Sequence, residues 1–158
     1  MTFPDFEEFI ASLNAHRVRY LVVGGYAVGF HARPRATKDI DVLVARTPAN
    51  AKRVRAAIRA FLGTDAPNVT EAKLQDPRTL IVLGVAPVRI DILTSIDGVP
   101  SFAAAWKRRA EGRYGRSPVT FIALEDLIAS KRAAGRPQDL ADADVLERAA
   151  RRRRRTSQ

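Results

Sequence analysis

Two aspartates in the first third of the chain have the spacing of a metal-binding pair. Asp39 and Asp41 stand two residues apart in a strand-like run that ends at Val44. Residues two apart on a strand share a face, so their Cβ atoms are roughly 6–7 Å apart. Bare carboxylates at that spacing repel, and a divalent cation such as Mg²⁺ or Mn²⁺ removes the conflict. On this spacing alone, two solvated acids at a strand end are the simpler interpretation.

A third acid lies in a later strand-like segment. Asp91 is the single acid in the apolar, alternating run 88–93, where an unpaired charge is costly. Arg89 lies on the same face and offers a salt bridge. A metal ion shared with Asp39 and Asp41 is the sharper alternative. Three acids on neighbouring strands can hold two ions about 3.5–4 Å apart, the arrangement used for in-line phosphoryl or nucleotidyl transfer.

A glycine pair follows the first strand-like run, 20–23. Gly24 and Gly25 precede a helix-like segment, where glycine lets the backbone approach phosphate oxygens and the helix start offers free amide donors. A tight turn is the ordinary reason for such a pair. The segment matches neither G-x-G-x-x-G nor the P-loop, since Phe30 and His31 stand where Lys and Ser/Thr should be. The sequence thus argues against a P-loop or Rossmann nucleotide site.

These residues need a scaffold that brings separate strands together. Apolar periodicity predicts strands among helices in the first two-thirds of the chain and helices in the last third, a pattern typical of α/β or α+β folds. The predicted strands are 20–23, 40–44, 79–83 and 88–93, the last two forming an antiparallel hairpin across 84–87. The predicted helices start near Thr2 and Pro4, then cover 26–30, 49–62, 101–109, 124–134, and 138 into the arginine run.

The 158-residue chain carries an excess of positive charge. Its 27 Lys and Arg against 17 Asp and Glu give +10, and Arg148 with the run 151–155 supplies six of these charges. A basic balance favours polyanionic partners. A terminal arginine run is more often a solvated tail than a specific site.

Composition also excludes several classes of site. The chain has no cysteine, which excludes disulfides and cysteine–zinc sites, and its two histidines are too few for a histidine metal cluster. No apolar run is long enough to span a bilayer, and acids follow Met1 instead of a basic leader. We therefore expect a soluble, cytoplasmic protein with no membrane partner.

Taken in order, the motifs resemble a known family. The resemblance rests on Gly24-Gly25, Arg35-x-Thr37-x-Asp39-x-Asp41 and Asp91. This order looks like the nucleotidyltransferase fold of the DNA polymerase β superfamily. The variant VGG-A…R-x-T-x-DID resembles small bacterial nucleotidyltransferases related to AbiEii toxins.

A second part of the resemblance lies near the C-terminus. Members of this group carry a helical lysine followed by R-x-(K/R)-D-x-x-D. Lys131 is followed here by Arg136, Asp139 and Asp142, and Gln138 replaces the commoner base.

The resemblance covers 20–146 and implies a fold. That fold is a small mixed β-sheet of nucleotidyltransferase type, flanked by helices and followed by C-terminal helices. We expect a nucleotidyltransferase core over 1–98, a C-terminal helical portion over 99–150 and a basic, disordered tail over 151–158.

The resemblance also implies metal and nucleotide ligands. Asp39, Asp41 and Asp91 would be catalytic and would bind Mg²⁺ or Mn²⁺, with Asp91 nearest the attacking hydroxyl. Gly24 and Gly25 would hold the phosphates of a nucleoside triphosphate.

Further residues take roles beside these. By the same resemblance, Lys131 would be catalytic and pair with the triphosphate, where the plain alternative is a solvated helix residue. Asp139 or Asp142 would position that lysine or the acceptor, and the plain alternative for Asp139 is a capping or surface acid. Arg35, which precedes the strand, would contact phosphate or a nucleic-acid backbone, or else brace its loop, and Thr37 is expected to be a structural turn or strand-entry residue.

Three hypotheses for function follow. The first is transfer of a nucleoside monophosphate from a triphosphate to a hydroxyl of RNA, such as a tRNA end, or of a protein. Relatives then suggest a toxin with a cognate antitoxin. The second is a catalytically degenerate relative that binds RNA or a protein, because Gly25 stands where many active transferases have serine. The third, a basic nucleic-acid-binding module, is disfavoured because the arrayed acids would repel phosphate without a metal.

Overall fold

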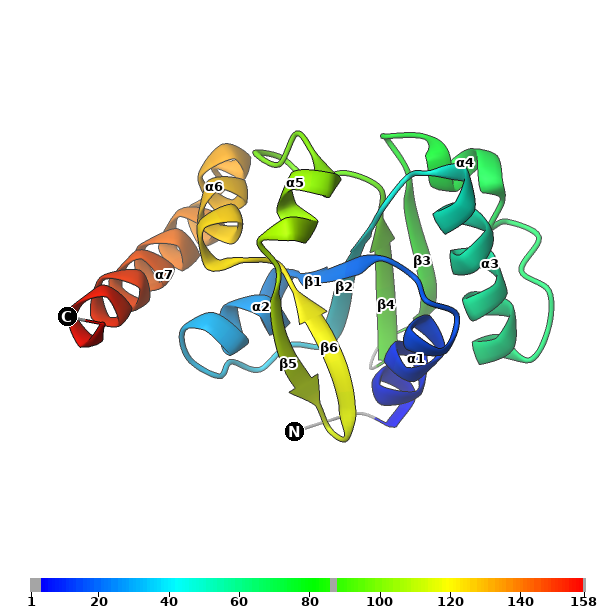
Figure 1. The fold of residues 1–158 in the computed structure, drawn as a ribbon, viewed down its shortest axis with the longest axis horizontal. Helices are drawn as coiled ribbons and strands as arrows, with labels where there is room; N and C mark the ends of the chain where they lie inside the picture. Colours follow the sequence, from blue (N-terminus) through cyan, green and yellow to red (C-terminus); the bar gives the residue numbers. More distant parts are fainter. Residues whose placement is uncertain (1–3, 86–87, 158) are drawn as a thin grey trace.

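The apolar runs form six strands and seven helices in the computed structural model, which describes residues 4–85 and 88–157 (Figure 1). The strands are β1 (Tyr20–Val23), β2 (Asp39–Val44), β3 (Leu80–Val85), β4 (Val88–Leu93), β5 (Ala110–Tyr114) and β6 (Ser117–Phe121). The helices are α1 (Pro4–Ala15), α2 (Gly24–His31), α3 (Pro48–Leu62), α4 (Glu71–Gln75), α5 (Phe102–Lys107), α6 (Leu124–Ala134) and α7 (Pro137–Thr156).

All six strands belong to one mixed sheet in the order β3-β4-β2-β1-β6-β5. Strands β2 and β4 run parallel, as do β1 and β6, whereas β1–β2, β3–β4 and β5–β6 are antiparallel. The predicted mixed α/β fold and the hairpin of β3 and β4 are confirmed. The predicted hairpin loop contains Ala86 and Pro87, which lie outside the described residues, as does Thr2 at the predicted helix start.

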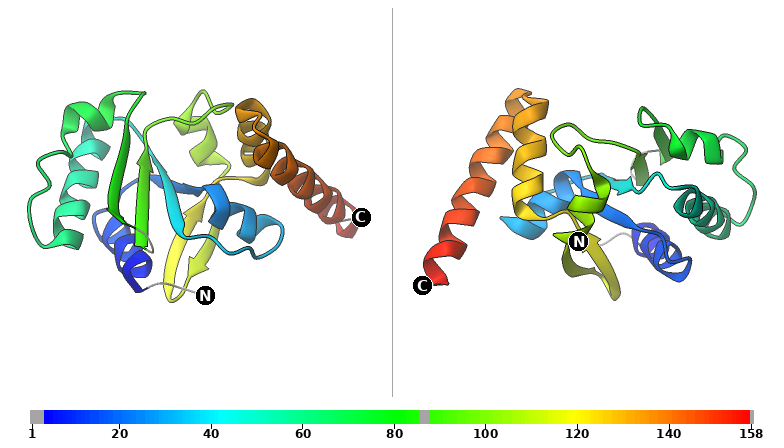
Figure 2. Two further views of the ribbon diagram at one scale, coloured as in Figure 1. Left: turned by 180° about the vertical axis from the view of Figure 1, so that it is seen from behind. Right: turned by 45° about the horizontal axis from the view of Figure 1, so that its top comes forward.

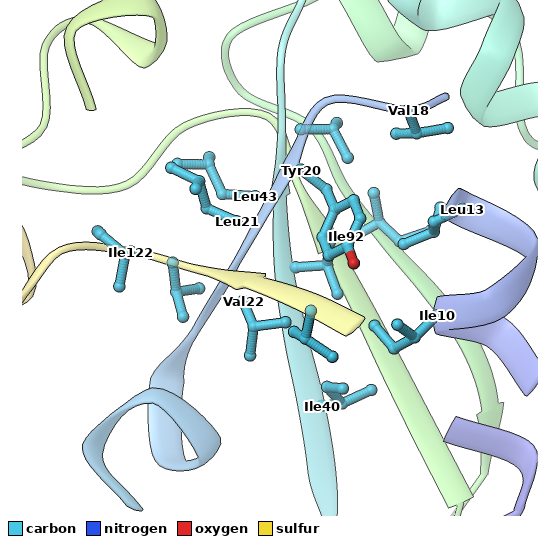
Figure 3. Packing of buried hydrophobic residues seen from close by; sticks show 14 of the residues in the cluster. Ile10, Leu13, Val18, Tyr20, Leu21, Val22, Ile40, Leu43, Ile92 and Ile122 are labelled. Carbon is cyan, nitrogen blue, oxygen red and sulfur yellow. The ribbon is translucent and has the colours of Figure 1, made fainter. Parts of the chain in front are cut away.

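The core fixes the strands that carry the acids. Ile10 and Leu13 of α1 are fully buried and point toward Tyr20 and Ile92 of two strands (Figure 3). Helices α1 and α3 pack together at one end of the molecule, and α6 and α7 pack together at the other (Figures 1 and 2). Burial of each such side chain stabilises the fold by roughly 1.5–3 kcal/mol. The core therefore holds β4, and β2 beside it, in a fixed position.

Residues 110–121 add two strands that the expected C-terminal helical portion did not include. They form the hairpin β5–β6, which turns at Gly115 (φ 60°) and joins the sheet beside β1. Of the five residues of β5, only Tyr114 is buried. Burial along β5 does alternate, but its inward positions include the small residues Ala110 and Gly112, so the apolar signal is weak.

The arginine run also differs from expectation. Helix α7 continues to Thr156, so residues 151–156 are helical instead of a disordered tail. Arginine is a good helix former. In addition, Arg153 Nη2 donates to the carbonyl of His31 at 2.9 Å and so ties this end of α7 to α2. Gln158 lies outside the described residues.

Candidate active site

The three predicted acids are brought to one place by the parallel pairing of β2 and β4. Asp41 is the direct register partner of Asp91, and Asp39 is the partner of Arg89. Because paired residues point to the same face, all three carboxylates project from one side of the sheet. They line a cavity of about 550 Å³.

Asp41 is the most perturbed carboxyl of this cluster. Burial, and then the neighbouring charges of Asp91 and Asp39, raise the pKa of Asp41 to about 7. The nearby Lys131 ammonium opposes the shift without reversing it. A site that disfavours ionisation of its central carboxylate has room for further positive charge.

Arg89 supplies part of that charge. Its Nε donates to Asp91 Oδ1 at 2.8 Å and its Nη2 donates to Oδ2 at 3.3 Å. The salt bridge that the sequence offered as an alternative is therefore present. Within residues 4–85 and 88–157, no three acidic or histidine side chains already stand close enough together to hold a metal ion. Coordination by all three acids would require Asp91 to exchange its guanidinium partner for the cation.

The glycine turn lies directly against Asp41. Gly24 has φ 68°, a left-handed conformation that favours glycine, and it begins α2 directly after β1. A Cβ built on Gly24 would lie 3.0 Å from Asp41 Cγ and closer still to a carboxylate oxygen. No side chain caps this end of α2, so its first amides are available to an anion.

The opposite wall comes from α6 and α7. Lys131 Nζ lies 3.0 Å from Asp142 Oδ2 and 3.5 Å from Asp139 Oδ1. Both acids are almost completely buried at the start of α7. The hydrogen bond from Arg136, whose Nε lies 2.6 Å from Asp139 Oδ2, holds the pKa of Asp139 below its usual range. Lys131 thus faces the cavity as an ordered cation and is not a solvated helix residue.

Arg35 and Gln138 complete the contacts of Asp142. Arg35 Nη1 lies 2.6 Å from Asp142 Oδ1, which braces the loop before β2 against α7. Gln138 Nε2 donates to the same oxygen at 3.0 Å. Arg35 also lines a second cavity, of about 300 Å³, beside Gly24, Gly25 and Lys131. Arg35 therefore braces the loop before β2 in this structure. From the same position it can also reach an anion in the smaller cavity.

The two cavities share Asp39, Asp41, Asp139 and Lys131, and their chemistry differs. The smaller one combines amide, hydroxyl and cationic donors with four carboxylates, a lining that suits a phosphate accompanied by cations. The larger one adds apolar side chains, including Leu93, Ile96 and Leu127. Oxygen ligands, a lysine and helix amides around one cleft are the components of metal-assisted phosphoryl chemistry.

Comparison with protein families places the chain in a known family. Residues 3–150 match the family described as nucleotidyltransferase of unknown function (DUF6036). The chain belongs to this family. No curated protein matches it. Within the described ranges, every helix of this nucleotidyltransferase-family protein is too short or too polar to span a bilayer.

The sequence underestimated two residues of this nucleotidyltransferase-family site. Asp142 was seen only as a helper of the lysine, but it is the acid that Lys131, Arg35 and Gln138 all contact. A signal was available, because Asp139 and Asp142 stand three apart and share a helix face. Thr37 is the turn residue that the sequence predicts, since its hydroxyl donates to the Asp39 carbonyl, and it also lines the smaller cavity.

Proposed function

We propose that the protein is a metal-dependent nucleotidyltransferase that moves a nucleoside monophosphate from a triphosphate to an acceptor hydroxyl. The observation that supports this best is the register of Asp41 opposite Asp91, with Asp39 on the same face and Gly24 against Asp41. The family shared over residues 3–150 supports the same class of reaction.

The donor set fits a hard divalent cation. Asp39, Asp41 and Asp91 offer only carboxylate oxygens, the ligands that Mg²⁺ and Mn²⁺ prefer. Burial first, and then the charges of Asp91 and Asp39, raise the pKa of Asp41, and a bound cation would offset both effects. When bound, Mg²⁺ or Mn²⁺ supplies charge neutralisation of the phosphates and lowers the pKa of the attacking hydroxyl.

The residues of the chain divide the reaction between them. The amides of Gly24 and Gly25 and the Lys131 ammonium hold the β- and γ-phosphates. The acceptor oxygen bonds to the α-phosphorus, the bond to the α–β bridging oxygen breaks, and pyrophosphate leaves with the electron pair. The hydroxyl proton passes to Asp91, the acid farthest from the glycine turn in the strand order.

The acceptor that the charges favour is RNA. Arg148, Arg151 and Arg155 are exposed and share one face of α7 at i, i+3 and i+7. We call these three the arginine row. The last acids of α7, Asp144 and Glu147, are both paired with Arg132, which leaves the row to an external anion.

One helix therefore connects the site to the arginine row. Asp139 at the site and Arg151 in the row are separated by about 18 Å of helix rise.

A role as a toxin with a cognate antitoxin stays a prediction of the AbiEii resemblance.

A second candidate function, binding without catalysis, is supported by the salt bridge of Arg89. The two-point contact of Arg89 with Asp91 fills the place of a cation with a side chain. A degenerate relative that binds RNA or a protein without catalysis would keep such a pair permanently.

The experiment measures nucleotide transfer by the wild type and by a variant of the acids proposed to bind the metal. Purified protein is incubated with Mg²⁺ or Mn²⁺, each labelled triphosphate, and total tRNA or total protein. We expect label on an acceptor, and none with Asp39→Asn/Asp41→Asn. The control Asp65→Asn/Asp144→Asn makes the same charge change at exposed acids and should transfer normally. Full transfer by the site variant would refute the assignment, and RNA binding without transfer would favour the degenerate candidate.

The arginine row has a separate test. Arg151→Gln/Arg155→Gln should weaken binding of an RNA oligonucleotide and reduce the slope of affinity against salt by about two. Lys52→Gln/Arg53→Gln removes equal charge from exposed positions on α3 at the other end of the molecule (Figure 1). Equal losses for both variants would mean that the row is no specific surface.

A further inference from the structure

Gly25 is glycine because of what stands next to it. Its φ is outside the left-handed region, so the backbone conformation does not require glycine. A Cβ at this position would lie 3.0 Å from Thr37 Oγ1 and 3.1 Å from Thr37 Cβ, which is tighter than ordinary contact. The missing side chain therefore leaves room for Thr37 to reach over the start of α2.

That approach brings a hydroxyl to the wall of the smaller cavity. Thr37 lines it together with Gly24, Gly25 and Lys131. Thr37 Oγ1 donates to the Asp39 carbonyl at 3.1 Å, which is long for a hydroxyl donor. A weak bond of this kind is readily exchanged for one to a charged acceptor, since hydrogen bonds to ionised groups are about twice as strong.

We propose that Thr37 is a phosphate-binding residue, whose hydroxyl donates to a terminal phosphate oxygen of the triphosphate. This rests on the proposed function and places the hydroxyl that the glycine pair lacks on a different segment of the chain. Four carboxylates, Asp39, Asp41, Asp139 and Asp142, line the same cavity, so a phosphate would enter it together with Mg²⁺ or Mn²⁺, and the surrounding donors would then hold its terminal oxygens. The first amides of α2 lie on one side, and Arg35 Nε would lie 3.6 Å from a Cβ on Gly25. Lys131 closes the cavity.

A purely structural role is the competing explanation. The bond from Thr37 to the Asp39 carbonyl also closes the turn that leads into β2. Loss of such a bond would lower stability and leave anion binding unchanged. The two roles therefore predict different results for the same variant, provided that melting and binding are both measured.

The probe is inorganic tripolyphosphate with Mg²⁺, measured by calorimetry on the full chain. We expect Thr37→Ala to bind it about 10- to 100-fold more weakly, the effect of one hydrogen bond to a charged group. Thr37→Ser keeps the hydroxyl and should stay within about three-fold of wild type. Thr70→Ala is the matched control, because its hydroxyl caps α4 outside both site cavities. It should cost stability without changing tripolyphosphate affinity.

A double variant tests the spatial argument directly. Gly25→Ser alone forces its Cβ against Thr37 and should weaken binding. In Gly25→Ser/Thr37→Ala the new side chain occupies the vacated space and returns a hydroxyl to the cavity. We expect the double variant to recover most of the affinity that Thr37→Ala loses. Such a reversal cannot come from two independent structural defects, which would add.

The outcomes separate this inference from the function on which it rests. If wild type binds tripolyphosphate and Thr37→Ala binds it equally well, the role of Thr37 is overturned and the proposed transferase stands. If Thr37→Ala melts lower but binds normally, the structural explanation holds. If wild type binds neither tripolyphosphate nor a nucleoside triphosphate with Mg²⁺ or Mn²⁺, both proposals are overturned.

Discussion

Replacing Gly24 by alanine is the sharpest single perturbation of the site, because the chain provides a matched control. Gly24 and Gly63 have nearly the same backbone conformation, with φ 68° and 73°. Gly63 ends α3, and a Cβ there would meet nothing within 4 Å. A Cβ at Gly24 would meet the carboxylate of Asp41. The two variants therefore share a backbone cost and differ in their effect on the acid.

The shared cost can be stated in advance. An L-residue in the left-handed region costs about 1–2 kcal/mol. In a chain of about this size that lowers Tm by about 2–8 °C. Gly63→Ala should show this loss and nothing more.

The additional effect of Gly24→Ala falls on the metal response. A Cβ 3.0 Å from Asp41 Cγ pushes the carboxylate aside, by about 1 Å if van der Waals separation is restored. Metal–ligand distances tolerate only about 0.2 Å. Since changes to groups that merely support a metal ligand cost about 10- to 100-fold in affinity, moving the ligand should cost about 100-fold or more.

The Mg²⁺ affinity can be followed as the difference in Tm with and without Mg²⁺. At about 100 times the Kd, Mg²⁺ stabilises wild type by about 2.7 kcal/mol, or about 5–11 °C in Tm. With a 100-fold weaker site the same concentration gives about 0.4 kcal/mol, or about 1–2 °C. Gly63→Ala should keep the full shift. A Gly24→Ala protein whose Mg²⁺ shift equals that of Gly63→Ala would refute the close approach to a metal-binding Asp41.

Three further variants test the charges of the fold. Because the pKa of Asp41 is raised to about 7, its stabilising contribution is present below pH 4 and is lost as pH rises to 7. Asp41→Asn should therefore melt above wild type at pH 8 in EDTA and should show no Mg²⁺ shift. Arg89→Met removes the internal competitor for Asp91, so Mg²⁺ affinity in calorimetry should rise by up to about five-fold; an unchanged affinity would mean that Arg89 stays on Asp91 in the loaded site. Burial lowers the pKa of His31, so urea denaturation should show wild type losing stability as pH falls below 6.5, and His31→Asn should lose less over that range.

The sequence predicted β2 and β4 well because the signal of each strand is local. Alternation in 88–93 and the apolar run after Asp39 reflect burial on both sides of each acid, and β4 begins and ends where the pattern indicated. That β2 and β4 lie side by side is not a local feature. The need to give Asp91 a partner predicts neighbouring strands, which the structure confirms, but not their parallel direction.

What the sequence could not reveal depends on contacts across long separations. Asp142 meets Arg35 from 107 residues away, and neither residue signals the other in the chain. Likewise, Thr37 approaches Gly25 only because β1 and β2 pair as they do. The edge strand β5 alternates in burial, but Ala110 and Gly112 contribute little apolar surface, so its own sequence predicts a strand only weakly. Residue propensity and hydrophobic periodicity carry no information about such long-range contacts.

The charges of the site explain how one cleft can stay folded when empty and still accept a highly charged ligand. Nine side chains form its charged network: Asp39, Asp41, Asp91, Asp139, Asp142, Arg35, Arg89, Lys131 and Arg136. The five acids exceed the four bases by a single charge, which the raised pKa of Asp41 partly cancels. Two divalent cations and a fully ionised triphosphate also cancel, so loading exchanges partners without changing the total. On the proposed function, Asp91 would exchange Arg89 for a cation and Lys131 would exchange Asp142 for phosphate, while Asp142 keeps Arg35. Metal alone would leave Arg89 without its partner, and a triphosphate alone would face the carboxylates of Asp39 and Asp41. Metal and nucleotide should therefore bind cooperatively, and each should bind weakly without the other.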